Sequence, residues 1–109
     1  MIDLVFVTHP DPSSAKRLIE RLVLEHWIAC GHILPPGTSV FIWEGQCRSE
    51  KESTLLLKSV PDHRKDLERE IRREHPYNVP EILFFSVDYG NEDYLAWVRE
   101  SCSRQPGRA

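Results

Sequence analysis

The stretch from Val40 to Val60, VFIWEGQCRSEKESTLLLKSV, decides the fold. Its first four residues and the run Thr54–Val60 are rich in β-branched, aromatic and aliphatic side chains, which is typical of strands. Between them, Glu44-Gly45 has the composition of a two-residue turn in which glycine supplies a positive φ. The stretch therefore predicts an antiparallel hairpin that returns through Gln46-Cys47-Arg48.

A strand and a helix precede this hairpin. Ile2–Thr8 is a short apolar run, which predicts a strand buried on both faces. Asp11 is a suitable N-cap, and apolar residues then recur at helical spacing to about residues 25–27. The segment after Cys30 contains Pro35-Pro36-Gly37, which predicts a bulge or an irregular edge before the hairpin.

Two helices and one more strand follow the hairpin. Charged residues dominate Pro61–Glu74, which predicts a solvated helix with a narrow core face. This helix ends before Pro76, because the residue before proline is disfavoured in the helical conformation. Glu81–Asp88 predicts the last strand, and Asn91 is expected to cap a final helix.

The order of elements, β-α-β-β-α-β-α, predicts an α+β fold. Right-handed crossovers place the first and third strands side by side. We therefore expect a ferredoxin-like β-α-β-β-α-β sandwich with an antiparallel four-stranded sheet, an extended hairpin between the second and third strands, and an extra C-terminal helix. Residues 1–103 are expected to form this single domain, and residues 104–109 a flexible tail.

The composition excludes several classes of partner and reaction. The 109 residues include 14 Lys+Arg and 17 Asp+Glu, which gives a net charge of −3. An acidic domain without a basic stripe is poorly suited to nucleic acid or anionic membranes. An RNA-recognition domain shares the order of elements, but Thr54–Lys58 lacks the aromatic residues that would stack on bases. No GxSxG, HExxH or phosphate-loop motif is present, so we expect no enzymatic activity.

The cysteines and the N-terminal sequence indicate a compartment. The three cysteines show no CxxC spacing, which argues against a disulfide framework or a thiolate zinc site. The N-terminus has no signal-peptide pattern, and no stretch approaches the roughly 20 apolar residues of a membrane-spanning helix. These features predict a cytoplasmic protein with reduced thiols.

The hairpin is expected to be longer than the two core helices can cover. It extends from about Val40 to Glu52, and Phe41, Ile42 and Trp43 stand near its tip. Exposed edges and aromatic patches are hazards for a soluble monomer. A closed ring of subunits, in which each covers the hairpin of another, would bury them. In the alternative, the hairpin bends and packs Trp43 onto its own core.

His75 is the best single candidate for a metal ligand. A neutral imidazole suits copper, zinc and nickel, and Glu74, Glu81 and the Tyr77 hydroxyl are expected within reach. The alternative is a histidine that ends a helix, favoured there by the negative end of the helix dipole and fixed by Pro76. Spacing alone leaves both interpretations open.

Simpler structural roles are expected for the cysteines and the other histidines. Cys30 is soft enough for Cu(I), although a lone cysteine between a helix and a strand more often packs as a small buried side chain. Cys47 and Cys102 are expected to be exposed. His9 and His32 lack metal-ligand spacing to each other and are expected to face solvent.

Lys58 interrupts an apolar strand and needs an explanation. A half-buried lysine must be paired or must extend to solvent, so we expect a carboxylate from Glu50, Glu52 or Glu81, from the same or a neighbouring subunit. Such a cluster lines a cleft between subunits or sets the register of an interface. The residues assigned to this cleft or interface are Trp43, Glu44, Glu52, Lys58, Tyr77 and Cys30.

Five stretches carry a resemblance to a known family. They are Thr8-His9-Pro10-Asp11, Ala29-Cys30, Trp43-Glu44-Gly45, His75-Pro76-Tyr77-Asn78-Val79-Pro80-Glu81 and Gly90-Asn91-Glu92-Asp93-Tyr94-Leu95-Ala96-Trp97. In this order they span almost the whole chain. The sequence resembles CutA, the family named for tolerance to divalent cations.

The resemblance implies a fold, an assembly and a role. It implies a ferredoxin-like subunit in a tight homotrimer, built like the nitrogen-regulatory PII proteins and associated with copper and other divalent ions. Neither an enzymatic reaction nor a required cofactor is implied. Members with a proposed copper site have a cysteine where this chain has Val7 and a histidine where it has Glu74.

Two functions follow from these observations. In the first, a non-enzymatic homotrimer binds Cu²⁺ or another divalent ion weakly through His75 and Glu81 and acts in the response to metal ions. In the second, a PII-like sensor binds a small metabolite or a partner protein in the cleft between subunits. The expected partners are therefore other copies of the chain and a divalent metal ion, with neither nucleic acid nor membrane.

Overall fold

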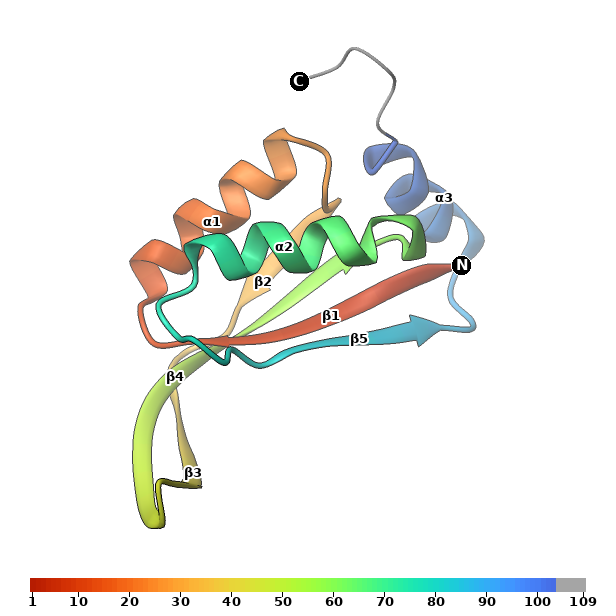
Figure 1. Cartoon of the computed structure of the whole chain (residues 1–109). Coiled ribbons are helices and arrows are strands. Elements are labelled where there is room, and N and C mark those ends of the chain that lie inside the picture. The colour runs from red at the N-terminus through yellow and green to blue at the C-terminus, as the bar shows by residue number, and fades with distance from the viewer. Residues whose placement is uncertain (104–109) are drawn as a thin grey trace.

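The computed structural model describes residues 1–103, and the tail expected over residues 104–109 lies outside the described residues. The elements in chain order are β1 (Ile2–His9), α1 (Pro12–Leu24), β2 (Cys30–Ile33), β3 (Gly37–Trp43), β4 (Gln46–Ser59), a short 3₁₀ helix (Pro61–His63), α2 (Arg64–Glu74), β5 (Ile82–Val87) and α3 (Glu92–Ser101). The predicted α+β fold is confirmed, and the extra C-terminal helix is present (Figure 1).

The sheet contains five strands where four were expected. Leu34, Pro35 and Pro36 are not part of a strand, so the predicted second strand is divided into β2 and β3. Proline lacks the N–H that a strand pair needs, which explains the break. Both pieces pair antiparallel with β4, and the strand order is β2-β4-β1-β5 with β3 also on β4.

Two helices cover one face of this sheet. Figure 1 shows α1 and α2 side by side above the strands. The Asp11 side chain caps α1 by accepting a hydrogen bond from the Ser13 N–H at 3.0 Å, as the N-cap prediction requires. The core beneath the helices is formed mainly by Val5, Val7, Leu18, Leu22, Leu55, Leu57, Leu67 and Ile71. Each such aliphatic side chain contributes about 1.5–3 kcal/mol when it is fully buried.

Helix α3 packs at one end of the sheet. Its Leu95 and Val98 form a second apolar cluster with Ile2, Ala29 and Cys102. The prediction that Cys102 is exposed is wrong, because only 2% of the residue is accessible and burial raises the pKa of its thiol to about 11. Apolar surroundings disfavour the thiolate.

The opposite face of the sheet remains open. Side chains alternate between the two faces of a strand, so residues next to the buried Val5 and Leu57 point away from α1 and α2. Leu4, Phe6 and Leu56 lie on this open face and are only partly buried, and Phe85 next to them is 49% exposed. Neither α1 nor α2 covers this apolar face, and α3 reaches it only at one end, where Ile2 packs against Leu95 and Val98 (Figure 1).

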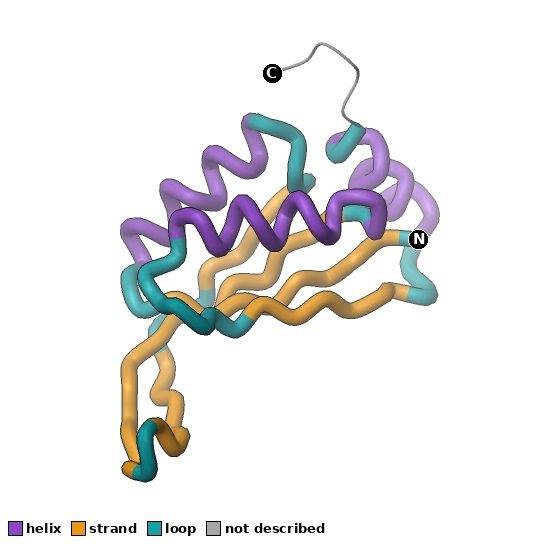
Figure 2. Tube along the Cα trace, in the orientation of Figure 1, coloured by secondary structure: helices purple, strands orange, loops and turns teal. Residues whose placement is uncertain are grey.

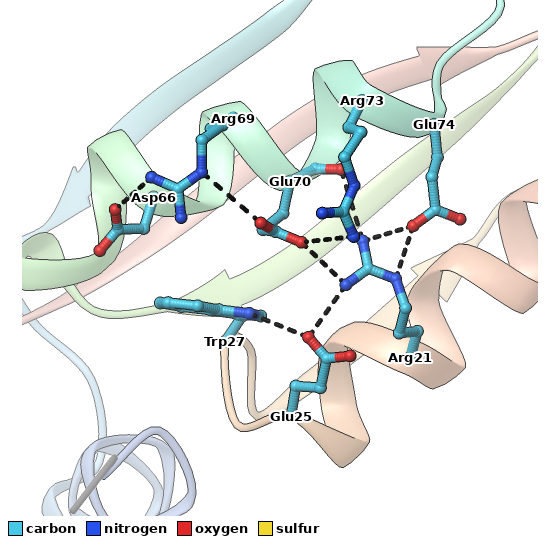
Figure 3. Close-up of polar contacts among 8 residues, drawn as sticks. All are labelled: Arg21, Glu25, Trp27, Asp66, Arg69, Glu70, Arg73 and Glu74. Carbon is cyan, nitrogen blue, oxygen red and sulfur yellow. Dashed lines mark hydrogen bonds and ion pairs between the residues drawn. The ribbon is translucent and has the colours of Figure 1, made fainter. Parts of the chain in front are cut away.

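An ion-pair network joins α1 to α2. Arg21 of α1 donates to Glu70 at 2.9 Å and also pairs with Glu74, while Arg73 approaches Glu70 at 3.2 Å (Figure 3). Burial acts to raise the pKa of Glu70, but the hydrogen bond from Arg21 and the charges of Arg73 and Arg69 leave the pKa lowered. The network therefore ties the C-terminal end of α2, which directly precedes His75-Pro76-Tyr77, to α1.

Candidate functional site

The hairpin of β3 and the first half of β4 projects from the body as an arm (Figures 1 and 2). Glu44 and Gly45 form its turn with φ angles of 51° and 79°, and the predicted positive φ at glycine is confirmed. Trp43 near the tip is 49% exposed, and Ile42 beside it is 74% exposed. The arm therefore does not bend back to bury Trp43 in its own core.

A cavity of about 440 Å³ lies between the arm and the loop that connects α2 to β5. One wall comes from alternate positions of the arm, since strand alternation brings these side chains to one face. These positions are Phe41 and Trp43 of β3 and Arg48, Glu50 and Glu52 of β4. The facing wall comes from the connecting loop and the end of β1, namely Thr8, Pro76, Tyr77, Asn78, Val79 and Glu81.

The cavity brings together four of the predicted residues. Trp43, Glu52 and Tyr77 line it, as does Glu81, whose Oε1 lies 3.5 Å from Thr8 Oγ1. Burial, then the hydrogen bond to Glu52, raises the pKa of the Tyr77 hydroxyl to about 12. The loop is thus tied to both the arm and the end of β1.

Other predicted cleft residues lie elsewhere. Glu44 stands in the turn at the far end of the arm. Lys58 pairs with Cys30 across β4 and β2, six positions from Glu52, which is roughly 20 Å along a strand. Within residues 1–103, no ion pair involves Lys58, so its expected carboxylate does not come from the described part of this chain. Cys30 is half-buried, with its sulfur 3.6 Å from the Tyr94 hydroxyl.

His75 lies behind the cavity and uses both ring nitrogens within the chain. Its Nε2–H donates to the Thr8 carbonyl at 2.7 Å, and its Nδ1 accepts from the Tyr77 N–H at 3.1 Å. The side chain is 8% exposed. A metal ion could bind His75 only by displacing one of these backbone contacts. Metal binding by His75 and Glu81 stays a prediction.

His9 is buried beside His75, so its expected solvent exposure is wrong. Only 1% of His9 is accessible, and the two rings lie 4.8 Å apart. Its Nδ1 accepts from the Asp11 N–H at 3.0 Å, while its Nε2 has no hydrogen-bond partner in residues 1–103. Burial, then the proximity of His75, lowers the pKa of His9. His32, by contrast, is exposed as predicted.

The described residues contain no cluster of three His, Cys, Asp or Glu side chains that could hold a metal ion. Val7 and Glu74 stand at the two positions that the resemblance to the family relates to a proposed copper site. Val7 is buried in the core, and Glu74 pairs with Arg21.

Sequence reasoning missed part of the cavity wall. Phe41 and Arg48, which face each other across the hairpin, both line it. The period-two pattern through residues 41, 43, 48, 50 and 52 was the available signal, because a hairpin with a known turn fixes which residues share a face.

Comparisons with known proteins place the chain in a family. Residues 3–101 match the family model described as "CutA1 divalent ion tolerance protein". The "Divalent-cation tolerance protein CutA" of Yersinia pestis (strain Pestoides F) is 41% identical over 98 residues, which cover 90% of this chain and 82% of that protein.

Solved structures agree in fold. The divalent cation tolerance protein (Cut A1) of Thermus thermophilus superposes with a TM-score of 0.91 at 34% identity, covering 94% of this chain and all of that chain. CutA1 from Oryza sativa gives a TM-score of 0.91 at 31% identity, covering 95% of each chain. No helix within residues 1–103 is long and apolar enough to cross a membrane. From the match over nearly its whole length, we conclude that the chain belongs to the CutA1 divalent ion tolerance protein family.

Proposed function

We propose that the protein acts as a non-enzymatic homotrimer in tolerance to divalent cations, and that it binds such ions weakly. The observation that best supports the trimer is the arm, which projects uncovered beside the open apolar face of the sheet. Trp43 and Phe85 are each 49% exposed, although the body buries other apolar side chains completely. Large exposed apolar patches mark association surfaces.

A ring of copies would satisfy several unpaired groups together. Among residues 1–103, β3 pairs with β4 alone, so its outer edge is open to a strand from another copy. Lys58 on the open face would find a carboxylate on a neighbour. Light scattering on the eluting protein should give three times 12.7 kDa, or about 38 kDa, whereas a clean 12.7 kDa species would contradict the trimer.

Weak ion binding is expected at the cavity. Glu81 lines it, as do Glu50 and Glu52, and His75 lies behind it. Calorimetry with Cu²⁺ and Zn²⁺ should show reduced affinity for Glu81→Gln and no change for the control Glu20→Gln on the exposed surface of α1. Equal affinity in Glu81→Gln and wild type would remove Glu81 from the site.

Cytoplasmic location is part of the proposal. Cys30, Cys47 and Cys102 are all free, which suits a reducing compartment. Separation of cell fractions should recover the protein with cytoplasmic markers, and recovery with periplasmic markers would contradict this location.

A second candidate function is favoured by the size of the cavity. About 440 Å³ falls within the range of small-molecule sites, and both aromatic and charged groups line it. A PII-like sensor would bind a metabolite there. A thermal-shift screen with nucleotides, organic acids and amines in the presence of chelator tests this function, because a ligand that binds only the folded state raises the melting temperature.

A further inference from the structure

The cavity at the base of the arm combines aromatic walls with unneutralised acidic groups. Phe41 and Trp43 stand on the arm, and Tyr77 stands on the facing loop. Phe41 is 38% exposed and Trp43 is 49% exposed, so both rings are available to a ligand. Aromatic faces attract cations through the ring quadrupole, and the attraction grows when water is excluded.

The charge of the lining favours a cation. Glu50, Glu52 and Glu81 face the cavity together with a single basic residue, Arg48. None of these four takes part in an ion pair among residues 1–103. Two negative charges therefore remain in excess. The pKa of Tyr77 is raised first by burial and then by Glu52 and Glu50, which is consistent with a negative potential in the cavity.

The spacing of the carboxylates suits an extended organic cation better than a metal ion. A metal ion needs its oxygen ligands within about 2.0–2.6 Å of one point. The described residues contain no such three-ligand cluster. Glu50 and Glu52 are two positions apart on one face of β4, which separates their backbones by roughly 7 Å. This separation is comparable with the distance between the nitrogens of an extended four-carbon diamine.

We propose that this cavity binds an alkyl diammonium ligand, whose ammonium groups meet Glu50 and Glu52 and whose methylene chain packs on Trp43 and Tyr77. The proposal rests on the second candidate function, ligand binding in the cavity. It does not depend on metal binding, and it requires that assembly of the copies leave this cavity open. It names the ligand class that such a sensor would recognise. Thr8 and Glu81 close the opposite wall.

Calorimetry on the assembled protein tests the proposal with 1,4-diaminobutane in chelator. The neutral comparison ligand is 1,4-butanediol, which has the same chain length without charge. We expect the diamine to bind and the diol not to bind. The double variant Glu50→Gln/Glu52→Gln should lose at least tenfold in affinity. The control Glu20→Gln should bind as wild type does, and light scattering should show that every variant keeps the wild-type mass.

Each other outcome overturns the proposal in a recognisable way. Equal binding of the diol would show that charge does not direct recognition. Unchanged affinity in the double Gln variant would place the diamine elsewhere. Binding of nucleotides or organic acids without the diamine would keep the sensor function and reject this ligand class. If no small ligand binds, as when a neighbouring copy fills the cavity, both the diamine proposal and the sensor function are rejected.

Discussion

The helix-covered body and the projecting arm share strand β4 and use it differently. In the body, Leu55 and Leu57 pack beneath α1 and α2 and are fully buried. In the arm, the six residues from Gln46 to Lys51 are all exposed, and only β3 accompanies them (Figure 2). A two-stranded ribbon is marginally stable in water by itself. The comparison therefore predicts that the arm obtains its stability from contacts outside its own chain.

Two neighbours on β4 offer the sharpest test of this difference. Leu57→Ala empties a fully buried position and should lower the free energy of unfolding by about 2–5 kcal/mol. Leu56→Ala removes the same atoms from the open face. In denaturant titrations, Leu57→Ala should lower the free energy of unfolding at every protein concentration. The loss of stability in Leu56→Ala should instead accompany weaker assembly. A Leu56→Ala protein of wild-type stability and mass would show that the open face is not an interface.

Trp43→Ala addresses the arm directly. If other copies bury this indole, truncation should weaken assembly by about 2–4 kcal/mol, as for a central aromatic contact. Analytical ultracentrifugation over a range of concentrations would show the shift toward monomer. Leu24→Ala provides the control, because Leu24 is a large apolar residue that is exposed on the body away from the arm. An equal shift toward monomer in both variants would show that the arm contributes no more to assembly than other exposed apolar residues do.

The junction of arm and body should respond to pH through His9. Its lowered pKa means that the folded state binds fewer protons than the unfolded state below about pH 6.5. Stability from the neutral His9 is therefore present above that pH and is lost as the pH falls toward the folded pKa. Protonation would also oppose the bond from the Asp11 N–H to Nδ1. Unfolding measured from pH 7.5 to 5 should show a smaller loss in His9→Gln than in wild type, and identical slopes would refute this role.

The smallest expected effect lies at the tip of the arm. Gly45 has a φ of 79°, a conformation that costs an L residue about 1–2 kcal/mol. Gly45→Ala should therefore weaken the arm by about 1 kcal/mol and leave the core unchanged. Gly37→Ala is the matched control, because Gly37 lies on the same hairpin and a Cβ there meets nothing within 4 Å. Equal stability of the two variants would show that the turn is not strained.

The body could be predicted from the sequence because local and tertiary signals agree there. Asp11 caps α1 and Glu44-Gly45 forms the turn, as their patterns indicate. In β1, Val5 and Val7 are buried as expected, whereas Leu4 and Phe6 on the other face are only partly buried. The division of β2 from β3 was visible only as an irregularity, since the effect of Pro35-Pro36 depends on pairing with β4.

The candidate site was harder to predict, because its geometry depends on contacts that are distant in sequence. His75 invited interpretation as a ligand, but the structure directs its nitrogens to Thr8 and Tyr77. His9 was expected in solvent, although it packs against His75, 66 positions away. A histidine's role is set by which groups face its two nitrogens, and composition does not contain that information.

Hydrogen exchange at single-residue resolution tests most directly whether other copies shelter the arm. In a lone chain, the β3 amides that point away from β4 have no strand partner among residues 1–103 and should exchange quickly. We predict that, at micromolar concentration, these amides exchange nearly as slowly as those of β1 in the body, and that dilution below the assembly threshold removes the protection. Rapid exchange of the outer β3 amides at every concentration would contradict the account.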